Sequence, residues 1–259
     1  MYADAHWVSE RLSARKQGTF KLDRRRSAIE LSRTKAFPEN VEFDVLLTYA
    51  GKPEGRLVRE VTPEAHSITL NQHHSFVKLP DETYQPRAFH PQSGCIPMSY
   101  MDYASPVYES IRKQFITRHR LEKKDPGAVL SEAVEPIIYY LDNGTPEPVR
   151  TALLEGGRWW NEAFEAIGFK DAFRVEILPE GADPMDVRYN MIQWVHRSTR
   201  GWSYGGFVVD PRTGEIIKGH VSLGSLRIRQ DFKIAQALVN SPYASDENMH
   251  QAMMDLALA

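Results

Sequence analysis

Residues 137–168 hold the pattern that most restricts the fold of this chain. A short apolar run at residues 137–141 predicts a strand, and Thr145 and Pro146 then provide a helix N-cap and a first helical residue. Apolar or small residues follow at spacings of three and four, which places them on one face of a helix; they are Val149, Leu153, Gly156, Trp160, Ala163, Phe164 and Ile167. Gly168 supplies the C-terminal stop. A strand followed by a long one-faced helix predicts a sheet with that helix packed on it.

The rest of the second half predicts more strands of the same sheet. They are expected at residues 173–178, 186–196, 207–209 and 216–223. The last two strands flank Asp-Pro-Arg-Thr-Gly, a strong hairpin turn. The order strand, helix, strand, strand, hairpin indicates a mixed sheet. The tail is expected to be helical, in the two pieces 230–239 and 247–258.

The first half carries mainly strand signals. Strands are predicted at residues 43–49, 67–70, 75–79 and 112–121, and the first of them is followed by the turn Ala-Gly-Lys-Pro. Residues 84–106 are rich in Pro, Gly, Tyr and Met without a clear period, which indicates an ordered irregular segment. A charged Pro-Gly run just before residue 130 is the best linker. The predicted fold is therefore α+β, with a β-rich N-terminal domain at residues 1–130 and a mixed-sheet domain at residues 131–259.

Composition excludes several classes of function. The 259 residues include 32 Lys and Arg against 34 Asp and Glu, so the net charge of -2 gives no reason to expect nucleic acid or an acidic membrane as partner. Cys95 is the only cysteine, so no intrachain disulfide can form. No stretch approaches the roughly 20 apolar residues of a membrane helix, and the charged start does not resemble a signal peptide. We expect either a cytosolic protein or one whose targeting segment has been removed.

Residues that could carry catalysis are scarce. No two of the nine histidines are four positions apart, so the two-ligand face of a zinc helix cannot be built from this chain. His73 and His74 would point to opposite faces of a strand, which disfavours a shared metal. Asp210 and Glu215 flank a turn and are better explained by turn formation than as an acid–base pair. We therefore predict no catalytic and no metal-binding residue in this chain.

Aromatic residues gather in the second half. Packing is the simpler explanation for Trp160 and Trp194, whereas Trp202 and Tyr204 lie beside glycines and could line a cleft.

Several ordered motifs of the second half carry a family resemblance. They include Leu-Asp-Asn-Gly at 141–144, Trp-Trp-Asn at 159–161, Asp-Val-Arg-Tyr-Asn at 186–190, Trp-Ser-Tyr-Gly at 202–205 and Gly-His-Val-Ser-Leu-Gly at 219–224. In this part the chain resembles bacterial zinc-dependent metallopeptidases of the metzincin type. The first half is similar to the β-rich N-terminal domain of the same proteins, through Phe-Pro at 37–38, His-His-Ser at 73–75 and Lys-Lys-Asp-Pro at 123–126.

The resemblance implies a metzincin-like twisted mixed sheet with a long packed helix. It also implies a parent protein that is exported and hydrolyses peptide bonds. In that protein an H-E-x-x-H helix would bind the zinc ion. That helix is absent here, so the chain alone is expected to be inactive and to be a piece of the longer peptidase. The resemblance assigns the strand at residues 216–223 to the sheet edge, where an extended peptide substrate would pair. The residues expected nearest to substrate are Gly219, His220, Val221 and Ser222, with Trp202 and Tyr204 beside them.

Two alternatives stay open. The chain could be a non-catalytic peptide-binding or interaction module that uses the same sheet edge. An unrelated hydrolase is disfavoured, because no constellation of Asp, Glu and His supports it. Whether the chain is a piece of a peptidase or a binding module, a sheet face without its covering helix would expose apolar surface. We therefore expect self-association.

Overall fold

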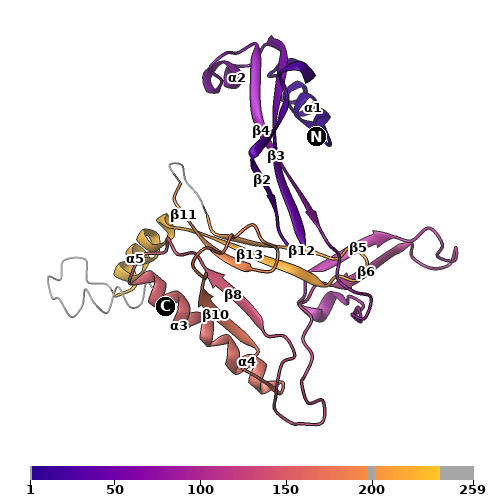
Figure 1. The fold of residues 1–259 in the computed structure, drawn as a ribbon, viewed down its shortest axis with the longest axis vertical. Coiled ribbons are helices and arrows are strands. Elements are labelled where there is room, and N and C mark those ends of the chain that lie inside the picture. The colour runs from indigo at the N-terminus through magenta and orange to yellow at the C-terminus, as the bar shows by residue number, and fades with distance from the viewer. Residues whose placement is uncertain (1, 198–201, 240–259) are drawn as a thin grey trace. The chain divides into compact units, whose positions relative to one another are not determined.

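The computed structural model describes residues 2–197 and 202–239, and it divides into two compact units, Met1–Lys78 and Leu79–Ala259 (Figure 1). Both units combine strands with helices, so the predicted α+β class is confirmed at that level. The division differs from the predicted boundary near residue 130, which lies inside the second unit. The reason is that residues 118–120 are tied to the second unit, through the bridge between Arg118 and Glu215 and the ion pair between Arg120 and Glu215.

The first unit is an antiparallel sheet built on one long strand. Its elements are α1 (His6–Ala14), β1 (Gly18–Leu22), β2 (Ala28–Ala36), β3 (Asn40–Pro53), α2 (Arg56–Val61) and β4 (Ser67–Val77). Strand β4 pairs with β3 along one side, while β1 and β2 pair with it on the other. The turn predicted after residue 49 is wrong, because β1 pairs with that part of β3 and extends it to Pro53. The two strands predicted at residues 67–70 and 75–79 form the single strand β4, because β3 offers it an uninterrupted partner.

A closed apolar core fills the upper part of this unit. Val45, Leu47 and Tyr49 alternate along β3 and face Phe20 of β1, and all four are almost completely buried. The Tyr49 hydroxyl donates a hydrogen bond of 2.8 Å to the carbonyl of Ala5, so its polar atom is satisfied inside the core. The large side chains of this core are therefore packed by residues of the first unit itself.

The second unit begins with a hairpin. Strands β5 (Pro97–Met101) and β6 (Arg112–Ile116) pair antiparallel, and two short strands, β7 (Ser131–Glu132) and β9 (Phe169–Lys170), pair parallel. The predicted strand at residues 112–121 is confirmed only as far as Ile116. Strand β5 lies inside the segment that was expected to be irregular.

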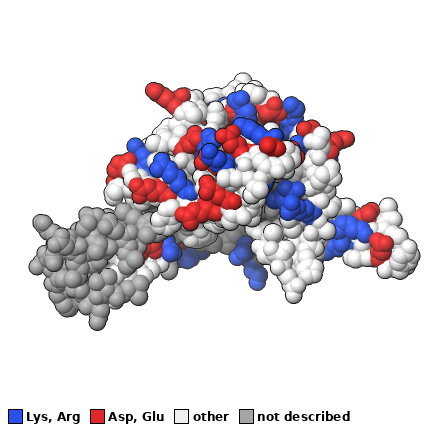
Figure 2. All heavy atoms as spheres, turned by 90° about the horizontal axis from the view of Figure 1, so that it is seen from below, with Lys and Arg blue, Asp and Glu red and all other residues white. Residues whose placement is uncertain are grey.

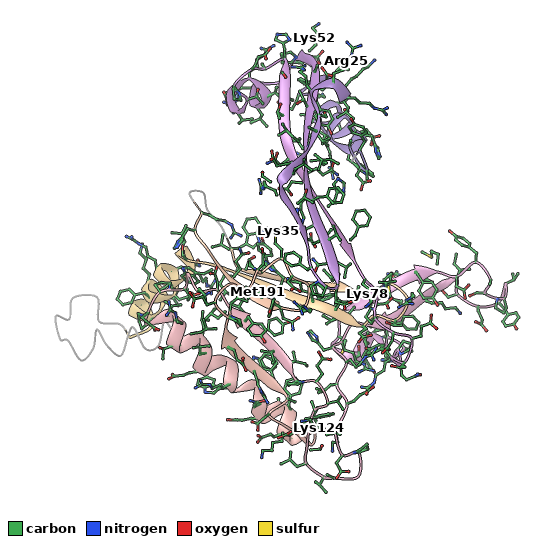
Figure 3. All side chains as sticks on the ribbon, viewed as in Figure 1. Arg25, Lys35, Lys52, Lys78, Lys124 and Met191 are labelled. Atoms are coloured by element: carbon green, nitrogen blue, oxygen red, sulfur yellow. The ribbon has the colours of Figure 1, made fainter. Side chains whose placement is uncertain are left out.

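A five-stranded mixed sheet is the centre of the second unit. It contains β8 (Ile137–Leu141), β10 (Phe173–Ile177), β11 (Asn190–Val195), β12 (Tyr204–Val209) and β13 (Ile216–Gly224) in the order β10-β8-β11-β13-β12. All neighbours are parallel except β12, which runs antiparallel to β13. Met191 lies on the middle strand and is 2% exposed (Figure 3). The prediction that residues 216–223 form the sheet edge is wrong, because β13 has β11 on one side and β12 on the other.

The helix predicted after β8 is present in two pieces. Helix α3 (Val149–Arg158) and helix α4 (Trp160–Ala166) are separated only by Trp159, which keeps helical dihedral angles. The helix begins three residues later than expected, with Pro148 as N-cap. The buried Thr145 hydroxyl has no hydrogen-bond partner among the described residues. Gly168 has a φ of 88°, as its role as a stop requires. Helix α5 (Leu226–Val239) contains the predicted helix at residues 230–239, whereas residues 247–258 lie outside the described residues.

Candidate functional site

The five-stranded sheet has two edge strands, β10 at one end and, next to the predicted residues Trp202 and Tyr204, β12. Among the described strands β12 pairs only with β13, so its other side offers backbone N–H and C=O groups to a further strand. Tyr204, Phe207 and Val208 on this strand are all exposed. Here the structure places an apolar edge strand with one free side.

Two of the residues predicted to bind substrate lie at the start of β12. Trp202 is 70% exposed and precedes β12, whereas Tyr204 is its first residue. Arg197 orients both, because its guanidinium donates a hydrogen bond of 2.9 Å to the Trp202 carbonyl and lies 5.4 Å from the centre of the Tyr204 ring. Trp202 and Tyr204 therefore lie at the edge formed by β12, whereas the sequence analysis expected the edge at residues 216–223.

Gly205 and Gly206 form the middle of the exposed strand. Among the described residues a Cβ atom added at Gly206 would meet nothing within 4 Å, and at Gly205 its nearest neighbour would be the His220 carbonyl oxygen at 3.8 Å. Neither residue has a positive φ. The fold itself therefore does not require glycine at either position, and what the pair provides is room for close approach by another chain.

The four predicted residues of β13 do not lie at the edge. Their strand pairs on both sides, so its backbone groups serve β11 and β12 and cannot also bind an extended peptide. The Gly219 N–H in addition donates a hydrogen bond of 2.7 Å to Oδ1 of Asn190. The main-chain docking predicted for this strand is thus wrong, and the sequence did not indicate it because strand order is a property of the whole sheet.

The same four residues are divided between the two faces of the sheet. Gly219 and Val221 face helices α3 and α4, and Gly219 leaves the space that the Tyr139 hydroxyl occupies. His220 and Ser222 face the opposite way and are joined by a contact of 3.1 Å between Nε2 and Oγ. Burial, together with the positive charge of Lys218, lowers the pKa of His220. The structure therefore does not gather the four side chains into one site.

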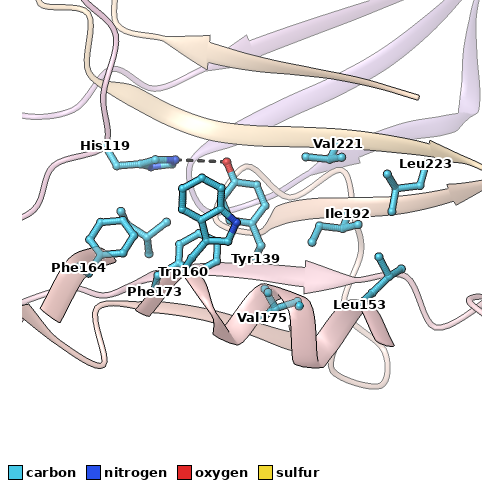
Figure 4. A pocket seen from close by; sticks show the side chains of 13 residues that line it. His119, Tyr139, Leu153, Trp160, Phe164, Phe173, Val175, Ile192, Val221 and Leu223 are labelled. Atoms are coloured by element: carbon cyan, nitrogen blue, oxygen red, sulfur yellow. Dashed lines mark hydrogen bonds between the residues drawn. The ribbon is translucent and has the colours of Figure 1, made fainter. Parts of the chain in front are cut away.

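An apolar groove lies between the helices and the sheet (Figure 4). It has a volume of about 470 Å³ and is lined by side chains from both layers, which include Leu153, Trp160, Phe164, Ile192, Val221 and Leu223. Trp160 is 62% exposed although it belongs to the predicted core face of the helix. The groove is thus the part of the helix–sheet interface that the described residues leave unfilled.

One polar pair lies in the wall of this groove. Nε2 of His119 is 3.4 Å from the Tyr139 hydroxyl, as the dashed line in Figure 4 marks. Burial lowers the pKa of His119 to about 4 and raises the pKa of Tyr139. Both groups are therefore neutral near pH 7. Sequence analysis missed this pair, because His119 and Tyr139 are 20 residues apart and no local motif joins them.

The carboxylates at the β12–β13 turn are saturated by arginines. Asp210 is completely buried, accepts a hydrogen bond from the Arg212 N–H at 2.8 Å and forms an ion pair of 2.7 Å with its guanidinium, which holds the pKa of the carboxyl below its usual range. Glu215 accepts hydrogen bonds of 2.7 and 3.0 Å from Arg120. The role in turn formation predicted for Asp210 is confirmed, whereas the Glu215 side chain forms an ion pair with Arg120 outside the turn.

The described residues do not form a metal centre. In residues 2–197 and 202–239 no three His, Cys, Asp or Glu side chains are grouped to hold a metal ion. Lys and Arg are interspersed with Asp and Glu on the face shown in Figure 2. None of the described helices has both the length and the apolar character needed to cross a bilayer.

Comparison with known proteins gives one match. Residues 1–124 are similar to a family described as "Domain of unknown function (DUF5117)". No curated protein and no solved structure matches the chain.

Proposed function

We propose that this chain is the substrate-binding part of a zinc-dependent metalloendopeptidase and that it binds extended peptide along β12. The observation that carries the proposal is the glycine pair on an exposed edge strand whose own fold needs no glycine. A peptide that pairs with this edge would bind through main-chain hydrogen bonds, and the absence of Cβ atoms at Gly205 and Gly206 would let the two backbones come close. Trp202, Tyr204 and Phe207 would contact its side chains.

The peptidase part of the proposal rests on the resemblance to metzincins together with the unfilled groove. An additional helix packed beside α3 and α4 would cover Ile192, Val221 and Leu223, and a zinc helix of the H-E-x-x-H type is the element that the resemblance leads us to expect there. The described residues of this chain do not fit a zinc site, so no zinc ligand and no step of zinc chemistry is assigned to them.

A non-catalytic peptide-binding module is the second candidate function. It uses the same edge of β12, and it is favoured by the arginine pairing of Asp210 and Glu215, which leaves neither carboxylate free to transfer a proton.

Binding of fluorescein-labelled casein to the whole chain tests the edge. The double variant Gly205→Val, Gly206→Val keeps a strand-forming sequence but fills the free space, and we expect it to weaken binding by about tenfold or more. The matched control is Gly156→Ala on α3, where an added Cβ also meets nothing within 4 Å. Equal affinity of the double variant and the parent chain would exclude docking at β12.

Zinc content and casein hydrolysis separate the two candidates. We expect both properties only in a protein in which this chain is combined with an H-E-x-x-H helix. Stoichiometric zinc in the present chain would contradict our placement of the ligands outside it. Casein binding without zinc or hydrolysis in the extended protein would favour the binding module.

A further inference from the structure

A histidine on β4 of the first unit lies between two buried carboxylates of β3. Glu42 and Asp44 are 4% and 5% exposed. The imidazole of His73 contacts both, with Nδ1 2.6 Å from Oδ1 of Asp44 and Nε2 2.7 Å from Oε2 of Glu42. Each of the two ring nitrogens therefore faces a carboxylate oxygen.

This arrangement requires two protons on the ring. An ionised carboxylate only accepts hydrogen bonds, and a neutral imidazole carries a hydrogen on one of its two nitrogens. If His73 lost a proton, a ring lone pair would face a buried carboxylate oxygen. Burial alone would lower the pKa of His73, but its hydrogen bonds to Asp44 and Glu42 raise it. His73 is therefore an imidazolium in this arrangement.

The other charged groups on this face of the sheet come from β2. Arg33 forms an ion pair of 2.7 Å with Asp44. Glu30 and Lys35 are the strand partners of Asp44 and Glu42, so they share the same face. We define the histidine cluster as three acidic and three basic side chains, namely Glu30, Glu42, Asp44, Arg33, Lys35 and His73. The charges of the histidine cluster balance only while His73 is protonated.

The histidine cluster lies at the half of β4 that the apolar core does not hold. In the first half of the strand, Ile68 and Leu70 pack against the core. In the second half none of the residues 73–77 is buried, and Phe76, which stacks on Phe43 of the other face, is 63% exposed. The attachment of residues 73–77 to β3 therefore depends more on the histidine cluster than on apolar burial.

We propose that the histidine cluster is a pH-sensitive switch, in which the charged His73 holds residues 73–77 on β3 and the loss of one ring proton releases them. The switch is closed below about pH 6.5 and opens as the pH rises through the pKa of His73 in the folded unit. Strand β4 ends at Val77, the first unit ends at Lys78 (Figure 3) and the second begins at Leu79. Release therefore lengthens the free segment that joins the two units. This proposal does not rest on the proposed function.

Hydrogen exchange of the whole chain at about pH 6 and about pH 9 tests the switch. Protection is the exchange rate of an unfolded chain divided by the observed rate at the same pH. In residues 73–77 it should fall about tenfold or more at the higher pH, because a lost hydrogen bond to a charged group changes an opening equilibrium by about this factor. Residues 67–71 should stay strongly protected at both pH values, because the apolar core holds them.

Two variants separate the charge of His73 from its packing. In Asp44→Asn the new amide can donate to the ring nitrogen that a neutral imidazole leaves without hydrogen, so residues 73–77 should stay protected at both pH values. In His73→Gln the charge is lost at every pH, so these residues should be poorly protected at both. The matched control is His66→Gln, because the His66 ring contacts the Gly51 carbonyl and not a carboxylate. It should respond to pH as the parent chain does.

Protection of residues 67–71 also shows that each variant is folded. The proposal is overturned if residues 73–77 of the parent chain keep their protection at about pH 9, or if residues 67–71 lose theirs together with them. It is equally overturned if Asp44→Asn responds to pH as the parent chain does.

Discussion

The two units differ in how completely the apolar side chains of their cores are covered. In the first unit the apolar face of β3 is closed by Phe20 and by helices α1 and α2, and its largest core side chains are almost fully buried. In the second unit α3 and α4 cover the sheet only in part, and Trp160 is left at the edge of an open apolar groove. A closed core gains the full hydrophobic stabilisation that its apolar side chains can supply, because they are removed from water. A unit with an open groove retains apolar surface that a further helix could cover, and this supports the peptidase part of our proposed function.

The two units also differ in the electrostatic surroundings of a partly buried histidine. His73 of the first unit lies between two buried carboxylates, with Nδ1 2.6 Å from Asp44 and Nε2 2.7 Å from Glu42. Burial opposes its charge, but the hydrogen bonds to Asp44 and Glu42 outweigh this and raise the pKa of His73. For His119 of the second unit the described residues supply no charged partner, and burial lowers its pKa. The first unit thus favours a charged imidazole and the second a neutral one.

The largest effect is expected from substitutions that test the difference in packing between the two cores. Leu47→Ala should lower the free energy of unfolding of the first unit by about 3 kcal/mol, because it leaves a cavity in a closed core. Leu153→Ala in the groove wall should cost only about 1 kcal/mol, because that side chain already borders open space. Hydrogen exchange in urea, followed at the amides of β3 and α3, measures the two units separately. Equal losses would show that the groove is as well packed as the core.

An opposite pH dependence of the two units is the next effect. The pKa of His119 is about 4 in the folded unit against 6.5 when unfolded, so the second unit should lose up to about 3 kcal/mol as the pH falls from 6.5 to 4. The pKa of His73 is raised above 6.5, so its contribution is fully present below pH 6.5 and is lost as the pH rises through the folded pKa. Urea midpoints against pH check both directions, with His119→Gln and His73→Gln as controls. A variant that keeps the parent pH profile would exclude its histidine as the cause.

The smallest effects on stability are expected for glycine substitutions on the neighbouring strands β12 and β13. They compare an open and a crowded position within one sheet. Gly219→Ala should cost about 2 kcal/mol, because the new Cβ would overlap the Tyr139 hydroxyl. Gly206→Ala should change stability by less than about 0.5 kcal/mol, because its Cβ meets open space. Thermal unfolding measures both. Tyr139→Phe should restore part of the loss in Gly219→Ala, and a lack of any restoration would contradict the proposed overlap.

Local signals in the sequence located most elements correctly. The strand at residues 137–141, the helix face with Leu153 and Phe164, the stop at Gly168 and the hairpin turn after Val209 all depend on residues close in the chain. The helix start was misplaced because Thr145 and Pro146 resemble an N-cap and first turn, whereas the chain turns once more before Val149. Element boundaries shift in this way when tertiary packing competes with local capping.

The candidate site was found only in part from the sequence. Trp202 and Tyr204, singled out because they lie beside glycines, are exposed and lie at the start of the edge strand β12. Gly219, His220, Val221 and Ser222 were assigned to the edge, yet they lie one strand inside it. The sequence by itself determined which segments become strands and helices and which faces are apolar, because these properties depend on spacing along the chain. Only the tertiary structure decided that β12 and not β13 is an edge strand and that His119 meets Tyr139 in an open groove, because strand order and long-range contacts depend on how distant segments pack together.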